Sequence, residues 1–308
     1  MKKILTLLFI FITFLIIFSC KKNSPTSPAV SYDYSELVSV PGGTFTQTDG
    51  TNSFSHTISS FKIGKYQVTY DLWQSVYQWA NANGYTFQNA GSYVLNNKYT
   101  PVTMVNWRDV IVWCNAYSQK TGLTPVYYSD ETFTMPIKDS TDGAYGSTIC
   151  TTAGCYDDPY VKWGANGYRL PTEGEYQYAA CYIDGSNWTP YNYASGAAAD
   201  YTDAIATGMV AWYSANCNIA QTVGTKNANS LGIYDMSGNV WEWCWDWEDA
   251  YPTGSNTNYK GYSSGISRVT RGGSSFDNAS SMQVGGRGVC NPYTSNAVDV
   301  GFRFARTY

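Results

Sequence analysis

Helix signals in this chain are few, and they lie in its first two thirds. Thr69, Asn106 and Thr172 each precede a stretch of helical character, and each is a residue type that caps helix N-termini. Glu175 follows Thr172 by three residues, the spacing of a capping box. From Gly232 onward, short strand-like runs alternate with turns. A few early helices followed by short strands and long irregular loops predict one α+β domain.

Three finer predictions concern local structure. Residues 38–49 alternate apolar and polar side chains around Pro-Gly-Gly, which is typical of a β-hairpin. Residues 183–208 are expected to be irregular. The first two helices carry apolar stripes, and the side chains expected to be buried are Leu72, Val76 and Trp79 in the first and Val110, Trp113, Cys114 and Tyr117 in the second.

The first 19 residues have the pattern of a signal peptide. Two lysines are followed by an apolar run from Ile4 to Phe18 and then by Ser19. This run has 15 residues, fewer than the roughly 20 that a membrane-spanning helix needs. Cys20 directly after Ser19 resembles the signal of a bacterial lipoprotein, in which the cysteine becomes the mature N-terminus and carries lipid. A plain secretory signal with an incidental cysteine is the alternative.

Residues 20–31 are rich in Pro and Ser, poor in apolar side chains, and predict a flexible tether. We therefore expect a folded domain at 32–308 that a lipid on Cys20 attaches to the membrane. The expected location is the bacterial cell surface or outer membrane.

The charge and the aromatic content limit the class of partner. The net charge is −4, and the only Lys/Arg pairs lie in the first 22 residues, so no basic stripe is available to neutralise phosphates. The chain has 28 Tyr, and Tyr, Ser, Gly and Asn dominate adaptable binding surfaces. We expect a protein or another surface ligand as partner, and no nucleic acid.

The numbers of cysteine and histidine residues do not indicate a catalytic site. Seven cysteines remain without Cys20, and Cys150 and Cys155 are close enough in sequence to close a short loop. The only histidine is His56, whereas a facial iron triad needs two. A phosphate-loop motif is absent from the sequence, and a single histidine leaves none for a catalytic triad besides His56. Three cysteines in apolar surroundings are expected to be buried: Cys114, Cys181 and Cys244.

Seven motifs occur in one order between Val38 and Arg306: VPGGTF, YQVTYDLW, PVTMVNWRDVIVWCN, GYRLPTEGEYQYAA, LGIYDMSGNVWEW, RVTRGGSS and GFRFAR. Together they resemble the formylglycine-generating enzyme (sulfatase-modifying factor) family. The resemblance implies a C-type lectin-like fold, in which a mixed sheet core with flanking helices supports irregular loops.

The resemblance also implies where the enzymes of this family bind copper(I). They use two cysteines, three and eight residues after Gly-Gly-Ser, and here these positions hold Asp277 and Met282. Neither supplies a thiolate, the soft ligand that copper(I) prefers. We therefore expect no enzyme and no required cofactor. The alternatives are an enzyme of the sulfatase-modifying type that uses other residues, or a structural envelope protein.

A calcium site of the family falls on the motif GNVWEW. Asn239 and Glu242 supply oxygen atoms of the kind that calcium binds. An ion pair between Glu242 and Arg303, without metal, is the alternative.

The C-terminal segment resembles the variable proteins of diversity-generating retroelements, a non-enzymatic branch of the fold. Their variable segment lies between ends that resemble Arg271–Ser274 and Gly301–Arg303, so residues 271–308 are the candidate variable region. The resemblance implies a non-catalytic, ligand-binding surface lipoprotein. A plain strand-loop-strand closing the sheet is the alternative. The expected ligand-binding residues, all reachable from an Asn codon through adenine changes or themselves Asn, are Phe276, Asp277, Asn278, Ser281, Gly286, Gly288, Val289, Cys290, Tyr293 and Thr294.

Overall fold

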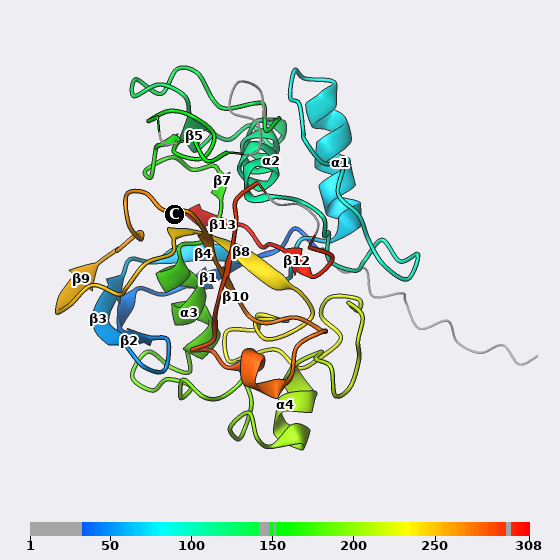
Figure 1. The fold of residues 1–308 in the computed structure, drawn as a ribbon, viewed down its shortest axis with the longest axis vertical. Helices are drawn as coiled ribbons and strands as arrows, with labels where there is room; N and C mark the ends of the chain where they lie inside the picture. Colours follow the sequence, from blue (N-terminus) through cyan, green and yellow to red (C-terminus); the bar gives the residue numbers. More distant parts are fainter. Residues whose placement is uncertain (1–32, 142–147, 151, 294–296) are drawn as a thin grey trace, which may run out of the picture. The chain divides into compact units, whose positions relative to one another are not determined.

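The computed structural model describes residues 33–141, 148–150, 152–293 and 297–308, and Tyr34–Tyr308 form one compact unit. Figure 1 shows its helices beside several small sheets. The helices are α1 (Tyr70–Asn81), α2 (Trp107–Lys120), α3 (Glu173–Cys181) and α4 (Ala204–Val210), with a 3-10 helix η1 (Ala279–Met282). None of the helices in these residues has the length and apolarity needed to cross a membrane.

Most strands from the C-terminal part of the chain belong to two four-stranded sheets, and the first of these also contains strands from the N-terminal part. The first has the order β1 (Leu37–Val40), β4 (Phe61–Gly64), β13 (Ala305–Thr307), β7 (Tyr168–Arg169). The second has the order β11 (Arg287–Cys290), β10 (Arg268–Arg271), β8 (Trp241–Trp247), β12 (Val300–Gly301). Two smaller sheets are β2 (Gly43–Thr48), β3 (Ser53–Ile58), β9 (Ser255–Thr257), and β5 (Tyr127–Tyr128), β6 (Tyr160–Val161).

The three expected helices form where their caps predict. Thr69, Asn106 and Thr172 are N-caps whose side chains accept backbone N–H groups, and the expected capping box of Thr172 and Glu175 is present. Helix α2 is buried along nearly its whole length, including its four predicted stripe residues. The central helix thus has no solvent face, which its stripe alone did not indicate.

The buried side of α1 differs from the prediction. Trp73, Val76 and Ala80 are buried, whereas Leu72 and Trp79 are only partly buried. The cause is a tertiary contact, because the Trp73 ring stacks on Trp113 of α2 with ring centres 5.9 Å apart. Only Val76 of the predicted stripe is fully buried.

The predicted hairpin at residues 38–49 is wrong. Strand β1 pairs with β4, and β2 pairs with β3, so the two halves of this stretch belong to different sheets. Residues 41–42 carry the chain across, and a Cβ on Gly42 would lie 2.8 Å from the Ile58 carbonyl oxygen. The alternating pattern identified two strands correctly, but it does not specify the partner of either strand.

The structure also bears on the stretch expected to be irregular and on the cysteines. Helix α4, capped by Asp203, begins within the stretch expected to be irregular and ends at Val210, two residues beyond it. Cys150 and Cys155 form the short-loop disulfide, and Cys114, Cys181 and Cys244 are buried as expected.

The end of the chain is part of the core. Strand β13 lies between β4 and β7, and β12 runs parallel to β8. Phe302 and Phe304 are buried, and Phe302 meets the rings of Trp73 and Trp113. The C-terminal segment therefore begins and ends at strands of the second sheet, β10 and β12.

Candidate ligand-binding surface

A buried arginine holds each end of the C-terminal segment. At the first end, Arg271 donates to Glu173 Oε1 at 2.6 Å and to the carbonyl oxygens of residues 284–286. The Arg271 and Glu173 side chains are only 1% and 2% exposed. One guanidinium thus ties helix α3 to the loop that precedes β11.

At the second end, Arg303 forms a bidentate ion pair with Glu242. The distances are 2.6 Å from Nε to Oε2 and 2.8 Å from Nη2 to Oε1, and both side chains are completely buried. Oε1 also accepts from Gln67 and Tyr176. Such charge-assisted bidentate pairs are rigid as well as strong.

The sequence allowed two roles for Glu242: a calcium site together with Asn239, or an ion pair with Arg303. The structure contains the ion pair. The Asn239 amide is itself bonded in both directions to the backbone of Gln221. Among the described residues, no group of three or more His, Cys, Asp or Glu is placed to hold a metal ion. Calcium at Asn239 and Glu242 stays an untested prediction, and we assign Glu242 the structural role.

The segment between the two ends separates into buried and accessible positions. Arg271–Ser275, Met282, Val284, Gly285 and Pro292 are buried. Phe276 and Val289 are 48% and 55% exposed. Thr294 lies outside the described residues. The other expected ligand-binding residues are exposed or partly exposed, namely Phe276, Asp277, Asn278, Ser281, Gly286, Gly288, Val289, Cys290 and Tyr293.

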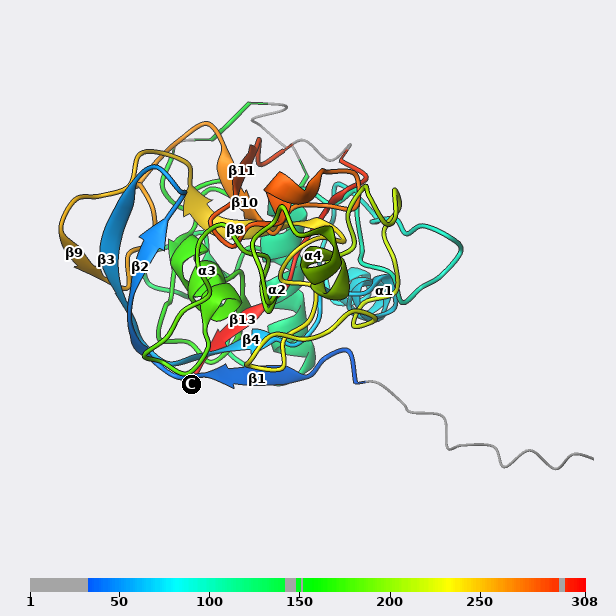
Figure 2. The same cartoon turned by 90° about the horizontal axis from the view of Figure 1, so that it is seen from below.

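These residues fall into two groups on neighbouring elements. One group lies on and before η1, and the other begins at Gly286, directly before β11, and continues on and after this edge strand of its sheet. A Cβ on Gly286 would lie 3.2 Å from the Ser281 carbonyl oxygen, so the groups adjoin there. Figure 2 shows β11 and the orange η1 on the same side of the unit, away from β1. They form one accessible surface.

Two of the glycines have little room for a side chain. A Cβ on Gly286 would lie 2.9 Å from the Gln283 carbonyl oxygen, a contact with rigid backbone. A Cβ on Gly288 would lie 2.6 Å from Thr270 Oγ1 and 2.9 Å from the Trp241 ring. On this backbone, both glycines are suited to contact a ligand through the main chain, and a larger residue at either position requires local movement.

Asp277 and Met282 have structural contacts at the positions where the copper enzymes carry cysteines. Asp277 Oδ2 accepts from the Ser274 backbone N–H and hydroxyl, at 2.9 and 2.7 Å. Met282 is fully buried, and its methyl group lies against Gly273. A turn carboxylate and a core thioether do not form a soft metal site.

A groove beside η1 extends the accessible surface beyond the C-terminal segment. It has a volume of about 420 Å³, and its wall includes Tyr201, Tyr213 and Ser214 together with Asn278 and Ser280. The backbone N–H of Ser214 donates to the Asp277 carbonyl oxygen, which fixes this wall to the segment. Sequence reasoning missed the wall because it lies next to α4, which was itself missed; two tyrosines in a polar stretch were the available signal.

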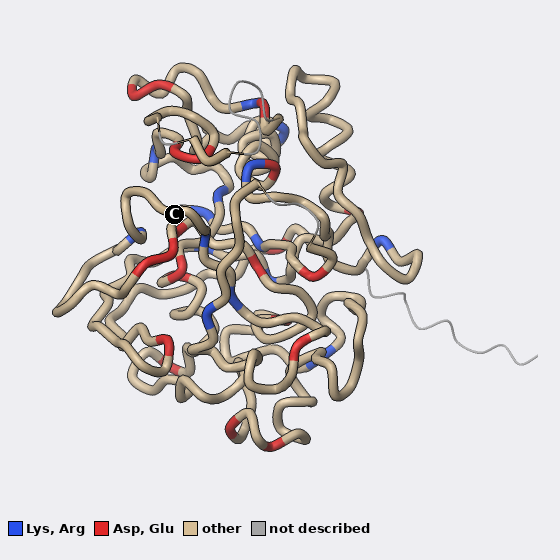
Figure 3. Tube along the Cα trace, in the orientation of Figure 1, with Lys and Arg blue, Asp and Glu red and all other residues tan. Residues whose placement is uncertain are grey.

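Charges on the unit are mixed. Figure 3 shows Lys and Arg spread along the trace among Asp and Glu, with no continuous basic stripe. His56 lies in β3 and is bonded to Gln47 and to the Tyr259 backbone.

Comparisons with known proteins cover nearly the whole unit. The model of the sulfatase-modifying factor enzyme 1-like domain matches residues 22–308. A chaperone protein LppX of Paenibacillus barcinonensis is 34% identical over 72% of this chain and 75% of its own length. The formylglycine-generating enzyme of Thermomonospora curvata is 32% identical over 47% of this chain and 51% of the enzyme. Among solved structures, Treponema denticola variable protein 1 gives a TM-score of 0.68 at 27% identity, covering 90% of this chain and 98% of that one.

Proposed function

Because this chain belongs to the sulfatase-modifying factor enzyme 1-like domain family, we propose that it uses the family fold to display a ligand-binding surface and catalyses no oxidation. The membership confirms the family predicted from the seven motifs, and with it the single C-type lectin-like domain. What the protein binds and whether it acts as an enzyme are the subject of this proposal.

The division of the C-terminal segment into buried and accessible residues carries the proposal. Its ends are held by Arg271 and Arg303, while Phe276, Asn278 and Val289 point away from the core. Exposed substitutions usually change stability by less than about 0.5 kcal/mol. The segment can therefore vary at exposed positions such as these three without loss of the fold, which is what a diversified binding site requires.

The likeness to a variable protein supports the same reading. Treponema denticola variable protein 1 covers the unit at 27% identity, and its name states that it varies. We propose that residues 271–308 vary between copies of this protein and that the ligand is a protein or another surface molecule. Lipid on Cys20, outside the described residues, would anchor the domain at the bacterial cell surface.

The relatives also include enzymes, so the oxidase alternative needs a direct test. Purified residues 32–308 are loaded with copper(I) and incubated in air with a cysteine-containing sulfatase peptide, and mass spectrometry follows the peptide. We expect no conversion to formylglycine. The Asp277→Cys/Met282→Cys double variant tests whether the two positions are close enough to restore copper binding, and a known formylglycine-generating enzyme serves as positive control. Conversion by the unaltered protein would overturn the proposal.

A further inference from the structure

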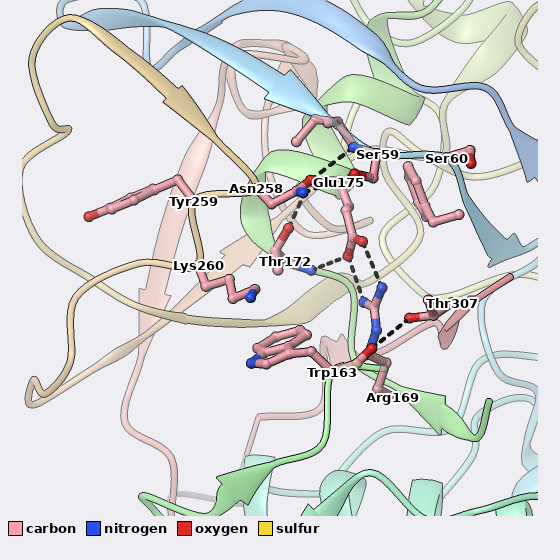
Figure 4. A pocket seen from close by; sticks show the side chains of 12 residues that line it. Ser59, Ser60, Trp163, Arg169, Thr172, Glu175, Asn258, Tyr259, Lys260 and Thr307 are labelled. Carbon is pink, nitrogen blue, oxygen red and sulfur yellow. Dashed lines mark hydrogen bonds and ion pairs between the residues drawn. The ribbon is translucent and has the colours of Figure 1, made fainter. Parts of the chain in front are cut away.

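A second concave site lies on the unit, and none of the ten expected ligand-binding residues lines it. It has a volume of about 190 Å³ and lies between the β3–β4 turn, the loop after β9, Trp163 and the end of β13. Figure 4 shows Lys260 on the loop after β9, directly above Trp163 and beside the Arg169–Glu175 pair, whereas the Tyr259 side chain points away from them. This site is built from residues that the proposed function does not use.

Lys260 provides the unpaired charge of this site. Its ammonium nitrogen lies 4.4 Å from the centre of the Trp163 ring. Within the described part of the chain, it forms no ion pair with a carboxylate. Partial burial lowers the pKa of Lys260, with a further lowering by Arg169. The Glu175 carboxylate of the same pocket opposes this lowering but forms its ion pair with Arg169. An ammonium group held over an aromatic ring and without an ion-pair partner of its own can bind an anion.

The floor of the site adds no opposing charge. Arg169 and Glu175 form a buried bidentate pair at 2.6 and 2.7 Å, and Glu175 also accepts from the Thr172 backbone N–H. The pair is neutral as a unit, so the lining carries a net positive charge from Lys260. The Arg169 Nε has no hydrogen-bond partner among the described residues, although the side chain is 95% buried.

The remaining walls are mixed. Ile58, Phe61 and Trp163 supply apolar surface, and the other lining residues are Ser59, Ser60, Thr172, Asn258, Tyr259 and Thr307. An apolar cavity of about 150 Å³ is large enough for a benzene ring. A cavity of this size with one unpaired cation suits an aromatic or aliphatic body that carries a single carboxylate.

We propose that this pocket binds a small organic carboxylate, with the anion at Lys260 and the apolar body against Trp163. Benzoate is the probe, and benzyl alcohol is its uncharged match. Saturation-transfer NMR and calorimetry on residues 32–308 measure binding at millimolar concentrations. We expect saturable binding of benzoate and at least about tenfold weaker binding of benzyl alcohol, because a charged hydrogen bond is lost.

Variants of Lys260 test whether benzoate binds at this pocket or is only attracted by the charge of the protein surface. Lys260→Gln should weaken benzoate binding about tenfold, whereas Lys260→Arg keeps the charge and most of the affinity. Lys226→Gln is the matched control, because Lys226 also lies over a tryptophan, 3.8 Å from the Trp212 ring centre and outside this pocket. Phe276→Ala should change nothing, which separates this site from the C-terminal surface.

Three outcomes would overturn the proposal: no saturable benzoate binding, equal binding of benzyl alcohol, or unchanged benzoate binding in Lys260→Gln. Thermal unfolding of each variant confirms that a loss of binding is not a loss of fold.

Discussion

Phe276 and Met282 lie six positions apart in one segment, yet they face opposite environments. Phe276 is about half exposed, while Met282 packs in a buried cluster with Val210 and Tyr213. Met282→Ala should cost about 2–5 kcal/mol of unfolding free energy, because it leaves a cavity. Phe276→Ala should cost no more than about 0.5 kcal/mol. Urea unfolding measures both values, and equal losses would contradict the division of the segment into buried and accessible residues.

His56 gives a second test at the residue scale. Its Nε2 accepts from the Tyr259 backbone N–H and its Nδ1 faces Gln47 Oε1 at 2.6 Å, an arrangement of the neutral ring. Burial lowers its pKa from 6.5 to about 4. Since the folded pKa is the lower one, the stabilisation is complete above pH 6.5 and is lost as the pH falls towards 4. The loss amounts to about 3 kcal/mol.

This test compares how the free energy of unfolding depends on pH in the unaltered protein and in His56→Gln, because other groups also titrate. Burial raises the pKa of Asp246 to about 8, so Asp246 favours the folded state increasingly as the pH falls, opposite in sense to His56. Unfolding free energies of the unaltered protein and of His56→Gln should therefore be compared between pH 4 and 7. We expect the variant to lack the His56 loss on acidification. Parallel profiles would show that His56 does not titrate as its contacts require.

At the scale of elements, Arg271 connects helix α3 to the loop before β11. Arg271→Met removes one partner of a buried ion pair and should cost about 3–5 kcal/mol. Hydrogen exchange should rise most at residues 284–286, whose carbonyl oxygens lose their donor. Arg287→Met is the control: it also removes a partner of Glu173, but Arg287 is partly exposed and Arg271 remains, so its cost should be smaller. Protection of residues 284–286 unchanged by Arg271→Met would contradict this role.

The elements also show what the sequence could specify. Caps at Thr69, Asn106 and Thr172 were predictable because a cap is a local contact between residues three apart. The partner strand of β1 was not predictable, since an alternating pattern indicates which side chains are buried and does not indicate which strand pairs with it. The rotation of α1 depends on Trp113, far away in the chain. Helix α4 is short, contains Gly208, and has little periodicity to detect.

For the whole molecule, the order of motifs predicted the family, and the resemblance predicted where the C-terminal segment begins and ends. The exposure of its middle followed from the same pattern, apart from the crowding at Gly286 and Gly288. The groove wall at Tyr201 and Tyr213 and the Lys260 pocket were not predictable, because each joins segments that only tertiary folding brings together.

Attachment of the protein to the membrane is predicted from its first 20 residues, through a lipid on Cys20. Cys20→Ser should release the protein from the membrane fraction, because the lipid would have no site of attachment. Fractionation of cells that produce either form measures this, and the folded domain of both should unfold at the same temperature. Equal membrane retention of the two forms would contradict the lipid anchor.

The most direct test of the central claim is to sequence the codons for residues 271–308 in many copies of the gene from a natural population. We predict substitutions concentrated at accessible positions such as Phe276, Asn278 and Val289, with Arg271, Met282 and Arg303 constant. Invariant codons throughout, or substitutions as frequent at the buried positions as at the accessible ones, would contradict the claim that this fold displays a variable binding surface.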